Sequence, residues 1–380
     1  MIYAAQALIQ ILSCLLIIKL VRPIFGDRPA FWASLFFAGD LTLAIANFEA
    51  MSEPVYLSLN LAALVCLLPL LTDTSAASSR LRLPVGALLL AIATLTRPVG
   101  LYVPFVFAIL LVLKGIRDRC IMQRMLQATV LLVLWSLPVA AWVTRNAITF
   151  SVPRLTNADA IMLVYFTGAG AYQIEHHLTL DEAQECIALE YQLPPPSITN
   201  NHWLGTQPAG EVDAQLRDVA RRVLLKYPRS LLVSSFLGVL KSTVSHNVGV
   251  LATASSEIWH APRLDRLVRA DAGAAKRLLQ NPLPLVIAFV WEVAYLAPTI
   301  IFALLGVVAS MQKQSFRWPA FVLLTLLAYF YLTVAIVGLE AYYRSRIPHM
   351  PILYAFSGLG VATLPTFRCY FRTSAPRCEL

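Results

Sequence analysis

The chain has 380 residues, of which 58% are hydrophobic and only 13% are charged, and its formal net charge is +9. A soluble protein does not carry that much continuous apolar sequence, so the composition excludes a soluble globular domain and indicates a polytopic membrane protein. The positive charge is explained by basic loops that set the membrane topology and by attraction to anionic lipid headgroups. The sequence has no basic patch interleaved with aromatic residues, so it does not predict nucleic-acid binding.

About nine apolar runs follow one another, and most have the ~20 residues that a helix needs to cross the hydrocarbon core. They lack the alternation of a membrane barrel, and an open sheet cannot span lipid. The sequence therefore predicts an all-α polytopic fold with a helical external cap. The expected spans are 3–21, 30–48, 54–72, 83–96, 99–114, 126–144, 284–309, 318–338 and 347–365.

These runs divide the chain into three parts. Residues 1–144 form an N-terminal transmembrane bundle of about six spans. Residues 145–282 form a long external segment, and residues 283–380 form a C-terminal bundle of about three spans with a cytoplasmic tail. The fourth and fifth runs are short and adjoin at Arg97 and Pro98, which predicts two tilted spans or one broken helix pair.

Lysine and arginine predict the orientation, because short cytoplasmic loops collect them. About half of the 30 basic residues fall in connections on one side, whereas the short connections opposite hold only Arg97, Arg344 and Arg346. The basic side is then cytoplasmic, and the long segment is periplasmic in a bacterial inner membrane. This places the N-terminus outside without a signal-peptide n-region, so we expect a further span upstream of Met1.

Two helices are predicted within the external segment. Thr179 and Glu182 form a capping box before a helix over 180–192. The stretch from Glu211 to Tyr227 is amphipathic and is ended by Pro228. Its apolar face consists of Val212, Leu216, Val219, Ala220, Val223 and Leu224. Residues 230–245 are apolar but short and carry Lys241, so this stretch is expected on the membrane surface or dipping into it.

Two carboxylates lie in or beside the predicted spans. Asp40 lies near the middle of the second span, where an acidic residue is a functional candidate or only pairs with a serine or arginine of a neighbouring helix. Glu53, in a Ser-Glu-Pro motif, lies where the third span begins. It is either a first-turn acid after Ser52 as N-cap or part of a site.

Two arginines lie at the outer ends of spans. Arg97 occupies the break in Leu-Thr-Arg-Pro, where its guanidinium either snorkels to the interface or binds an anion, with phosphate as the best bidentate match. Arg145 follows Trp142 at the end of the sixth span and is either a flanking residue or a second phosphate contact.

The densest polar cluster beside a span runs from Glu340 through Tyr343, Arg344 and Arg346. In a continuous helix, Glu340 and Arg344 are one turn apart and can pair, which leaves Arg346 free for an external anion. The structural reading is a solvated loop with a local ion pair. The histidines show no zinc spacing such as HExxH, so the sequence predicts no metal site and no cofactor.

In this order, the motifs resemble those of the C-type membrane glycosyltransferases that use polyprenyl-phosphate sugars. This group includes protein O-mannosyltransferases and the lipid A aminoarabinose transferase, and the likeness extends over nearly the whole chain. The similar stretches are 12–28, 52–54, 93–100, 142–146, 156–157 and 344–351. The chain departs from the family in reading Arg344-Ser345-Arg346 for RYR and in having no counterpart of the first span and first external loop.

The resemblance implies an inverting transfer of a sugar from a polyprenyl-phosphate donor to a glycolipid or protein acceptor at the external face. Arg97, Arg344 and Arg346 are the phosphate contacts implied, with Glu53 shaping the site and Asp40 a weaker candidate. The family's general base would lie in the loop upstream of this sequence. Positive side chains can stabilise the leaving phosphate without a metal.

Two alternatives remain open at this point. A transporter or flippase for polyprenyl-linked sugars also needs arginines for phosphate, and it predicts inverted repeats and broken spans near the midplane. An inactive, truncated member of the transferase family would explain the missing first loop.

Overall fold

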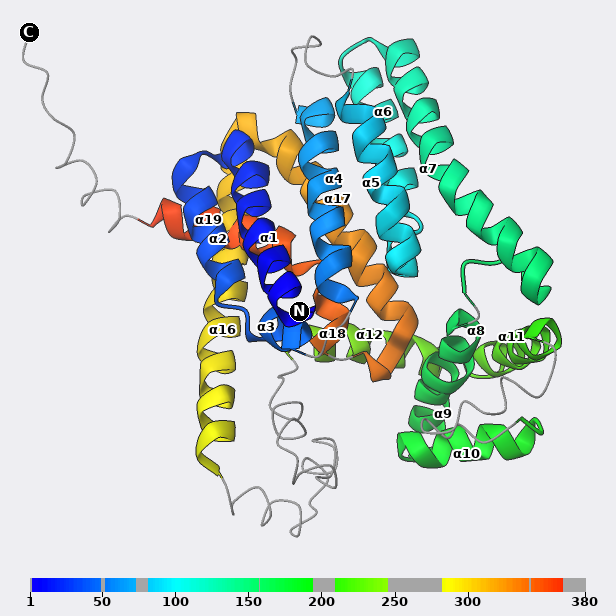
Figure 1. The fold of residues 1–380 in the computed structure, drawn as a ribbon. Helices are drawn as coiled ribbons and strands as arrows, with labels where there is room; N and C mark the ends of the chain where they lie inside the picture. Colours follow the sequence, from blue (N-terminus) through cyan, green and yellow to red (C-terminus); the bar gives the residue numbers. More distant parts are fainter. Residues whose placement is uncertain are drawn as a thin grey trace, which may run out of the picture. The chain divides into compact units, whose positions relative to one another are not determined.

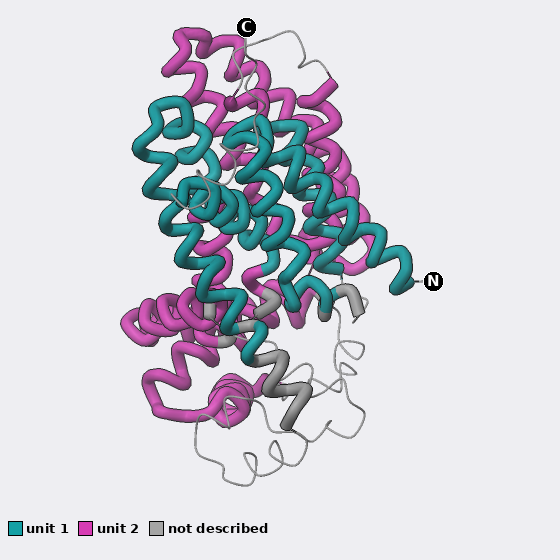
Figure 2. Tube along the Cα trace, turned by 90° about the vertical axis from the view of Figure 1, so that its left-hand side faces the viewer, with its two compact units in different colours: residues 1–68, 244–324, 347–380 teal, residues 69–243, 325–346 magenta. Residues whose placement is uncertain are grey.

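The computed structural model describes residues 2–48, 52–72, 81–156, 158–193, 209–244, 282–341 and 343–364. Within these residues every regular element is helical, as predicted, and there is no strand. The chain divides into two compact units, coloured separately in Figure 2. The first comprises residues 1–68, 244–324 and 347–380, and the second comprises residues 69–243 and 325–346.

The first unit is built from long apolar helices. Its elements, labelled in Figure 1, are α1 (Ile2–Phe25), α2 (Asp27–Ala38), α3 (Leu41–Phe48), most of α4 (Glu53–Thr72), α16 (Pro282–Gln312), the beginning of α17 (Gln314–Val337) and α19 (Met350–Thr363).

The second unit combines apolar helices with a group of shorter ones. Its elements are α5 (Arg82–Thr96), η2 (Pro98–Gly100), α6 (Val103–Arg117), α7 (Ile121–Phe150), α8 (Ala158–Met162), η3 (Leu163–Gly168), α9 (Ala169–His176), α10 (Leu180–Glu190), α11 (Ala209–Lys226), nearly all of α12 (Pro228–Val244), the end of α17, η5 (Gly338–Glu340) and α18 (Tyr343–Arg346).

Six helical stretches in the described part of the chain are long and apolar enough to cross a membrane. They are α1, α4, η2 with α6, α7, the 293–312 part of α16, and α17. Two further apolar helices, α5 and α19, have only 15 and 14 residues. The chain is therefore a membrane protein with several spans.

The predicted continuous span over 30–48 is wrong, because the helix breaks at Gly39 and Asp40. A Cβ at Gly39 would lie 3.3 Å from the ring of Tyr295, so the tyrosine ring lies directly on the chain at the break. The Asp40 carboxylate accepts a hydrogen bond from the N–H of Thr42 at 2.8 Å, which caps α3 as a new helix. Gly39 and Asp40 are visible in the sequence, but their contact with the ring of Tyr295 in α16 is not, so the break was not predicted.

Glycines bring α19 into close contact with two neighbouring helices. A Cβ at Gly358 would lie 2.2 Å from the carbonyl oxygen of Pro29 in α2, and one at Gly360 would lie 2.0 Å from that of Phe302 in α16. The two positions lie on opposite faces of α19, because successive residues of a helix are about 100° apart. Small residues allow this backbone-to-backbone packing, which stabilises helices in lipid where the hydrophobic effect does not.

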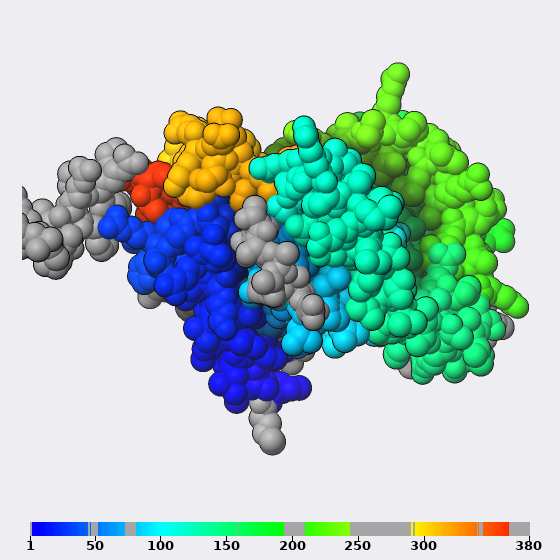
Figure 3. All heavy atoms as spheres, turned by 90° about the horizontal axis from the view of Figure 1, so that it is seen from above, coloured from blue at the N-terminus to red at the C-terminus, as the bar shows by residue number. Residues whose placement is uncertain are grey.

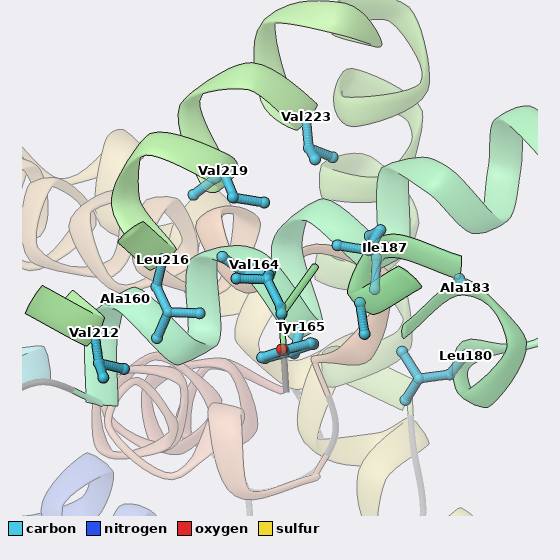
Figure 4. Close-up of a cluster of buried hydrophobic side chains, with 14 residues drawn as sticks. Ala160, Val164, Tyr165, Leu180, Ala183, Ile187, Val212, Leu216, Val219 and Val223 are labelled. Atoms are coloured by element: carbon cyan, nitrogen blue, oxygen red, sulfur yellow. The ribbon is translucent and has the colours of Figure 1, made fainter. Parts of the chain in front are cut away.

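Helices α8, η3, α9, α10 and α11 form a cluster with its own core, which we call the α8–α11 cluster. Figure 4 shows side chains of α11 directed toward those of the α8–η3 segment and α10. The predicted apolar face of α11 is confirmed, since five of its six residues are buried: Val212, Leu216, Val219, Ala220 and Val223. The predicted capping box at Thr179 and Glu182 is also present.

The cluster contains one element that the sequence did not predict. Residues 158–176 form a helix with a π-helical stretch, η3, in its middle. The side-chain amide of Gln184 in α10 donates to the carbonyl of Tyr165 at 2.6 Å, and the hydroxyl of Thr167 donates to that of Ile336 at 2.7 Å. The wider π turn therefore leaves carbonyls and side chains available for partners in α10 and α17.

Helix α11 ends at Lys226, as Pro228 predicted, and α12 continues at a bend of 98°. Three contacts from the α8–α11 cluster hold this bend. Tyr227 hydrogen-bonds His176 at 3.1 Å, Lys226 donates to Glu190 at 2.8 Å, and the hydroxyl of Ser230 donates to Glu175 at 2.5 Å. The angle between the two helices is therefore set by side chains and not left to a linker.

Candidate functional site

The predicted site residues fall in both units. The first unit holds Asp40 and Glu53, and the second holds Arg97, Arg145, Glu340, Tyr343, Arg344 and Arg346. The two groups are therefore described separately below.

Arg97 lies in a break between α5 and α6, where backbone and side-chain hydrogen bonds hold the chain. Its backbone is extended, with φ −147° and ψ 128°, while its N–H still bonds the carbonyl of Ala93. The hydroxyl of Thr94 donates to the carbonyl of Leu90 and accepts a hydrogen bond from the indole N–H of Trp135 at 3.1 Å. The arginine side chain is half-buried. Both predicted alternatives stay open, since the stretch Pro98–Arg117 is long and apolar enough to cross a membrane by itself and α5 has only 15 residues.

The break is attached to α17 through Tyr329. The tyrosine hydroxyl donates to the carbonyl of Val99 at 2.5 Å and accepts from the N–H of Tyr102 at 3.4 Å. Tyr329 lies eight residues before Val337, where α17 ends, which is about 12 Å along a helix. The segment that carries Arg97 therefore lies roughly two turns before the end of α17.

The polar cluster after α17 is not one continuous helix. Glu340 ends η5, and Ala341 is extended, with φ −64° and ψ 132°. Tyr343 and Arg344 belong to a separate four-residue helix, α18. The expectation that Glu340 and Arg344 occupy successive turns of one helix is therefore wrong. The side chains of Glu340, Tyr343 and Arg344 lie outside the described part of the structure.

Two side chains of α12, Ser234 and Lys241, form a platform that holds the turn before α18. The hydroxyl of Ser234 accepts the N–H of Leu339 at 2.9 Å, and the ammonium of Lys241 donates to the carbonyl of the same residue at 2.9 Å. Gly338 adopts the left-handed conformation, with φ +74°, and a Cβ on Gly238 would lie 1.9 Å from its oxygen. Helix α12 thus fixes the backbone two residues after α17 ends.

This platform explains two residues whose roles the sequence did not reveal. Lys241 was recognised only as a charge in an apolar stretch, yet it satisfies a carbonyl that the end of α17 leaves open. Ser234 is fully buried on α12 and gave no sequence signal, because a serine in an apolar helix has many uses. A spacing of seven residues, which puts both on one face, is the signal that could have found them.

Arg346 is fully buried, with 0% of its surface exposed, and it makes an interaction within the chain. The expectation that its guanidinium is free for an external anion does not describe this structure. Burying a charge is costly unless the surroundings compensate it. A completely enclosed arginine, seven residues beyond Leu339, is an unusual electrostatic feature of the candidate site.

Arg145 has partners at the end of α7, where Figure 3 shows that helix in teal beside the green cluster helices. Its guanidinium lies 5.1 Å from the ring centre of Trp142 and 4.9 Å from that of Phe150, and it donates to Asn146 at 2.9 Å. The amide of Asn146 in turn donates to the carbonyl of Arg154 at 2.8 Å. These contacts fold the chain after α7 back against the helix, and both expected roles of Arg145, a flanking residue and a phosphate contact, stay predictions.

Asp40 is buried in the first unit, with 2% exposure. Besides capping α3, its carboxylate accepts a hydrogen bond from the hydroxyl of Tyr354 in α19. The nearby hydroxyl of Tyr295 donates to the carbonyl of Phe36. Asp40 therefore joins the broken helix to α19 through a tyrosine, and not through the serine or arginine that the sequence predicted.

Glu53 begins α4 and is almost completely buried, with 1% exposure. The carbonyl of Ser52 accepts the N–H of Tyr56 at 2.9 Å, so Ser52 starts the helix, as the structural reading of this motif predicted. The Ser52 hydroxyl also approaches the Glu53 carboxylate at 3.4 Å. A buried acid in the first turn is stabilised by the helix dipole.

Among the residues that the structure describes, no three His, Cys, Asp or Glu side chains come together as a metal site requires. In comparisons with known proteins, no family model, no curated protein and no solved structure matches the chain. Any statement about function therefore rests on the motifs and on the site geometry.

Proposed function

We propose that the chain transfers a sugar from a polyprenyl-phosphate donor to a lipid or protein acceptor at the external face of the cell inner membrane. The observation that carries this proposal is the fully buried Arg346. A fully buried charge is expensive to keep unless its surroundings compensate it, so we infer that Arg346 is kept for function. Phosphate is the anion that a guanidinium binds best, because its donors form a planar fork.

Because Arg346 is buried, its charge interacts strongly with other charges several ångströms away. Two unit charges about 6 Å apart interact by about 3 kcal/mol at an effective dielectric of about 20, against less than about 1 kcal/mol in water. Arg346 can therefore stabilise a phosphate that touches only its neighbours. In this proposal Arg344 contacts the phosphate directly, and Arg346 adds positive charge from inside the protein.

Arg97 is the second proposed contact. Its break is attached to α17 about two turns before the turn that leads to Arg344 and Arg346. A polyprenyl phosphate has its headgroup at the boundary and its tail in lipid, so arginines spread over this depth suit its junction. The aromatic contacts of Arg145 favour a supporting role at the end of α7.

The chemistry proposed is an inverting displacement. The acceptor hydroxyl oxygen forms a bond to the anomeric carbon while the bond from that carbon to the phosphate oxygen breaks. A carboxylate accepts the hydroxyl proton as general base, and the polyprenyl phosphate leaves with the bonding electron pair. The arginines stabilise the negative charge that develops on the leaving phosphate.

The transporter alternative predicts inverted repeats and broken spans near the midplane. It receives less support because the sequence shows no repeat between its halves. The polar cluster from Glu340 to Arg346 also follows the end of α17 and does not interrupt a span.

The test is a transfer assay with purified protein in lipid nanodiscs and a panel of polyprenyl-phosphate sugars. We expect sugar transfer to a glycolipid or peptide acceptor, reduced at least about tenfold by Arg97→Ala and by Arg344→Ala, since a hydrogen bond to a charged group contributes about 1.5–3 kcal/mol. Arg117→Ala, on the side predicted to be cytoplasmic, is the matched control and should transfer normally.

Two outcomes would overturn the proposal. Normal transfer by both Arg97→Ala and Arg344→Ala would remove the phosphate site. Wild-type protein that leaves every donor chemically intact, but moves it between the leaflets of reconstituted vesicles, would favour the transporter instead.

A further inference from the structure

Helix α12 has two faces of opposite character. One face carries small and polar residues: Ser230, Ser234, Gly238 and Ser242 are buried, and Lys241 is half-buried. The opposite arc exposes large apolar side chains: Leu232, Val233, Phe236, Leu237 and Leu240. Leu232 is 72% exposed and Phe236 is 64% exposed. This reverses the usual order, in which the apolar face of a helix packs on the protein.

The contacts with Leu339 give the level of α12 relative to the end of α17. The 24 residues of α17 are about 36 Å long, enough to cross a hydrocarbon core of about 30 Å, so Leu339 lies at a membrane boundary. Ser234 and Lys241, which contact Leu339, lie on either side of the middle of α12. A helix that crossed the membrane would have its middle about 15 Å from either boundary.

The preceding helix cannot extend α12 into a span. Helix α11 buries its apolar face in the α8–α11 cluster, and it carries charged residues along its length. Its side chains include the ion pairs of Arg217 with Asp213 and Asp159. The bend of 98° is held by the contacts of Tyr227 and Lys226.

We propose that α12 is an in-plane membrane helix, whose apolar arc lies in the lipid of the interface while its polar face holds the turn that leads to α18. The partner is the phospholipid surface itself. Ile336, in the last turn of α17, is 52% exposed, so exposed apolar surface extends from the end of the span to the turn that α12 contacts. Arg229 is exposed on the same arc as Phe236, and a long basic side chain at the beginning of α12 can extend to anionic headgroups.

This inference goes beyond the proposed function, because the location of α12 does not depend on any reaction. Its consequence is that the turn before α18 is held by a helix whose own position depends on the membrane surface. A protein released from lipid would lose that support.

The experiment uses spin labels on single cysteines, introduced into the full chain after its six native cysteines are replaced by alanine. Labels at Leu232, Phe236 and Leu240 are compared in nanodiscs with a label at Leu189, an equally apolar residue that is 80% exposed on α10. Oxygen reports contact with lipid, and a water-soluble nickel chelate reports contact with water.

We expect the three α12 labels to collide several-fold more with oxygen than with nickel, and the Leu189 label to show the reverse. The α12 pattern should weaken when the nanodisc is replaced by detergent micelles with a small headgroup layer. Nickel access at Phe236 equal to that at Leu189 would contradict the inference. Low access to both reagents would mean that protein covers the arc, and it would contradict the inference as well.

Discussion

The buried carboxylate of Asp40 accepts a hydrogen bond from the hydroxyl of Tyr354, a residue 314 positions away in the sequence. Its other oxygen accepts the N–H of Thr42 at 2.8 Å. Neither bond needs a negative charge. The geometry shows that Asp40 joins the broken α2–α3 helix to α19, and we predict that it takes no part in proton transfer.

Asp40→Asn should keep the fold and the activity, because the amide oxygen can accept the N–H of Thr42 while the amide NH2 donates to the hydroxyl of Tyr354. Asp40→Ala should lower the free energy of unfolding by about 1–3 kcal/mol, since it leaves buried donors without an acceptor. Thermal unfolding in detergent and the transfer assay measure the two effects. An Asp40→Asn protein that folds normally but is inactive would restore Asp40 as a catalytic candidate.

The close contact between Gly238 and Gly338 predicts that α12 cannot accept a side chain at this point. Gly238→Val should destabilise the protein by about 1–3 kcal/mol or more, because the added atoms meet backbone that cannot move away. Leu240→Val, on the exposed arc of the same helix, is the matched control. Equal melting temperatures for the two variants would show that α12 does not pack on the turn as described.

The pair of Glu190 and Lys226 predicts how the α8–α11 cluster responds to acid. The hydrogen bond from Lys226 lowers the pKa of Glu190 below its usual value of 4.5. A carboxylate with a lowered pKa in the folded state stabilises the protein above the unfolded pKa, and this stabilisation is lost as the pH falls through the folded pKa. The effect is small because the pair lies at the surface.

Glu190→Gln should therefore reduce the loss of thermal stability between neutral and acidic pH. The measurement is the melting temperature of wild type and variant across that range. A variant whose melting temperature falls with acid as steeply as that of the wild type would show that this pair does not contribute.

The predicted orientation can be checked with single cysteines in intact cells. A cysteine in place of Ser52, which is exposed before α4, should react with a membrane-impermeant maleimide. A cysteine in place of Arg119, exposed between α6 and α7, should react only after the membrane is permeabilised. The opposite labelling pattern would reverse the topology and place the arginine cluster on the cytoplasmic side.

Apolar periodicity predicted much of the fold, because lipid requires continuous apolar helices and these are visible in sequence. The amphipathic face of α11 and the capping box of α10 were also predictable, because both depend on the spacing of residues close together in the sequence. The break at Asp40 was not, because it is decided by contacts with Tyr295 and Tyr354 from distant parts of the chain.

The candidate site was predictable in its residues but less so in its geometry. The sequence marked Arg97 and Arg346, yet it did not show that Tyr329 attaches the break of Arg97 to α17 or that Arg346 is enclosed. The supporting residues Ser234 and Lys241 gain their role only from a turn about 100 positions later in the chain. Such contacts between distant residues produce no periodic pattern in the sequence.

The most direct test of the central claim is whether the protein binds the phosphate of a polyprenyl lipid. Native mass spectrometry of the full chain released from nanodiscs can compare a polyprenyl monophosphate with the polyprenol of the same length. We predict retention of the phosphate form alone, with at least about tenfold weaker retention by Arg97→Ala and Arg344→Ala and unchanged retention by Arg117→Ala. Equal retention of phosphate and alcohol, or retention that ignores both arginines, would contradict the account.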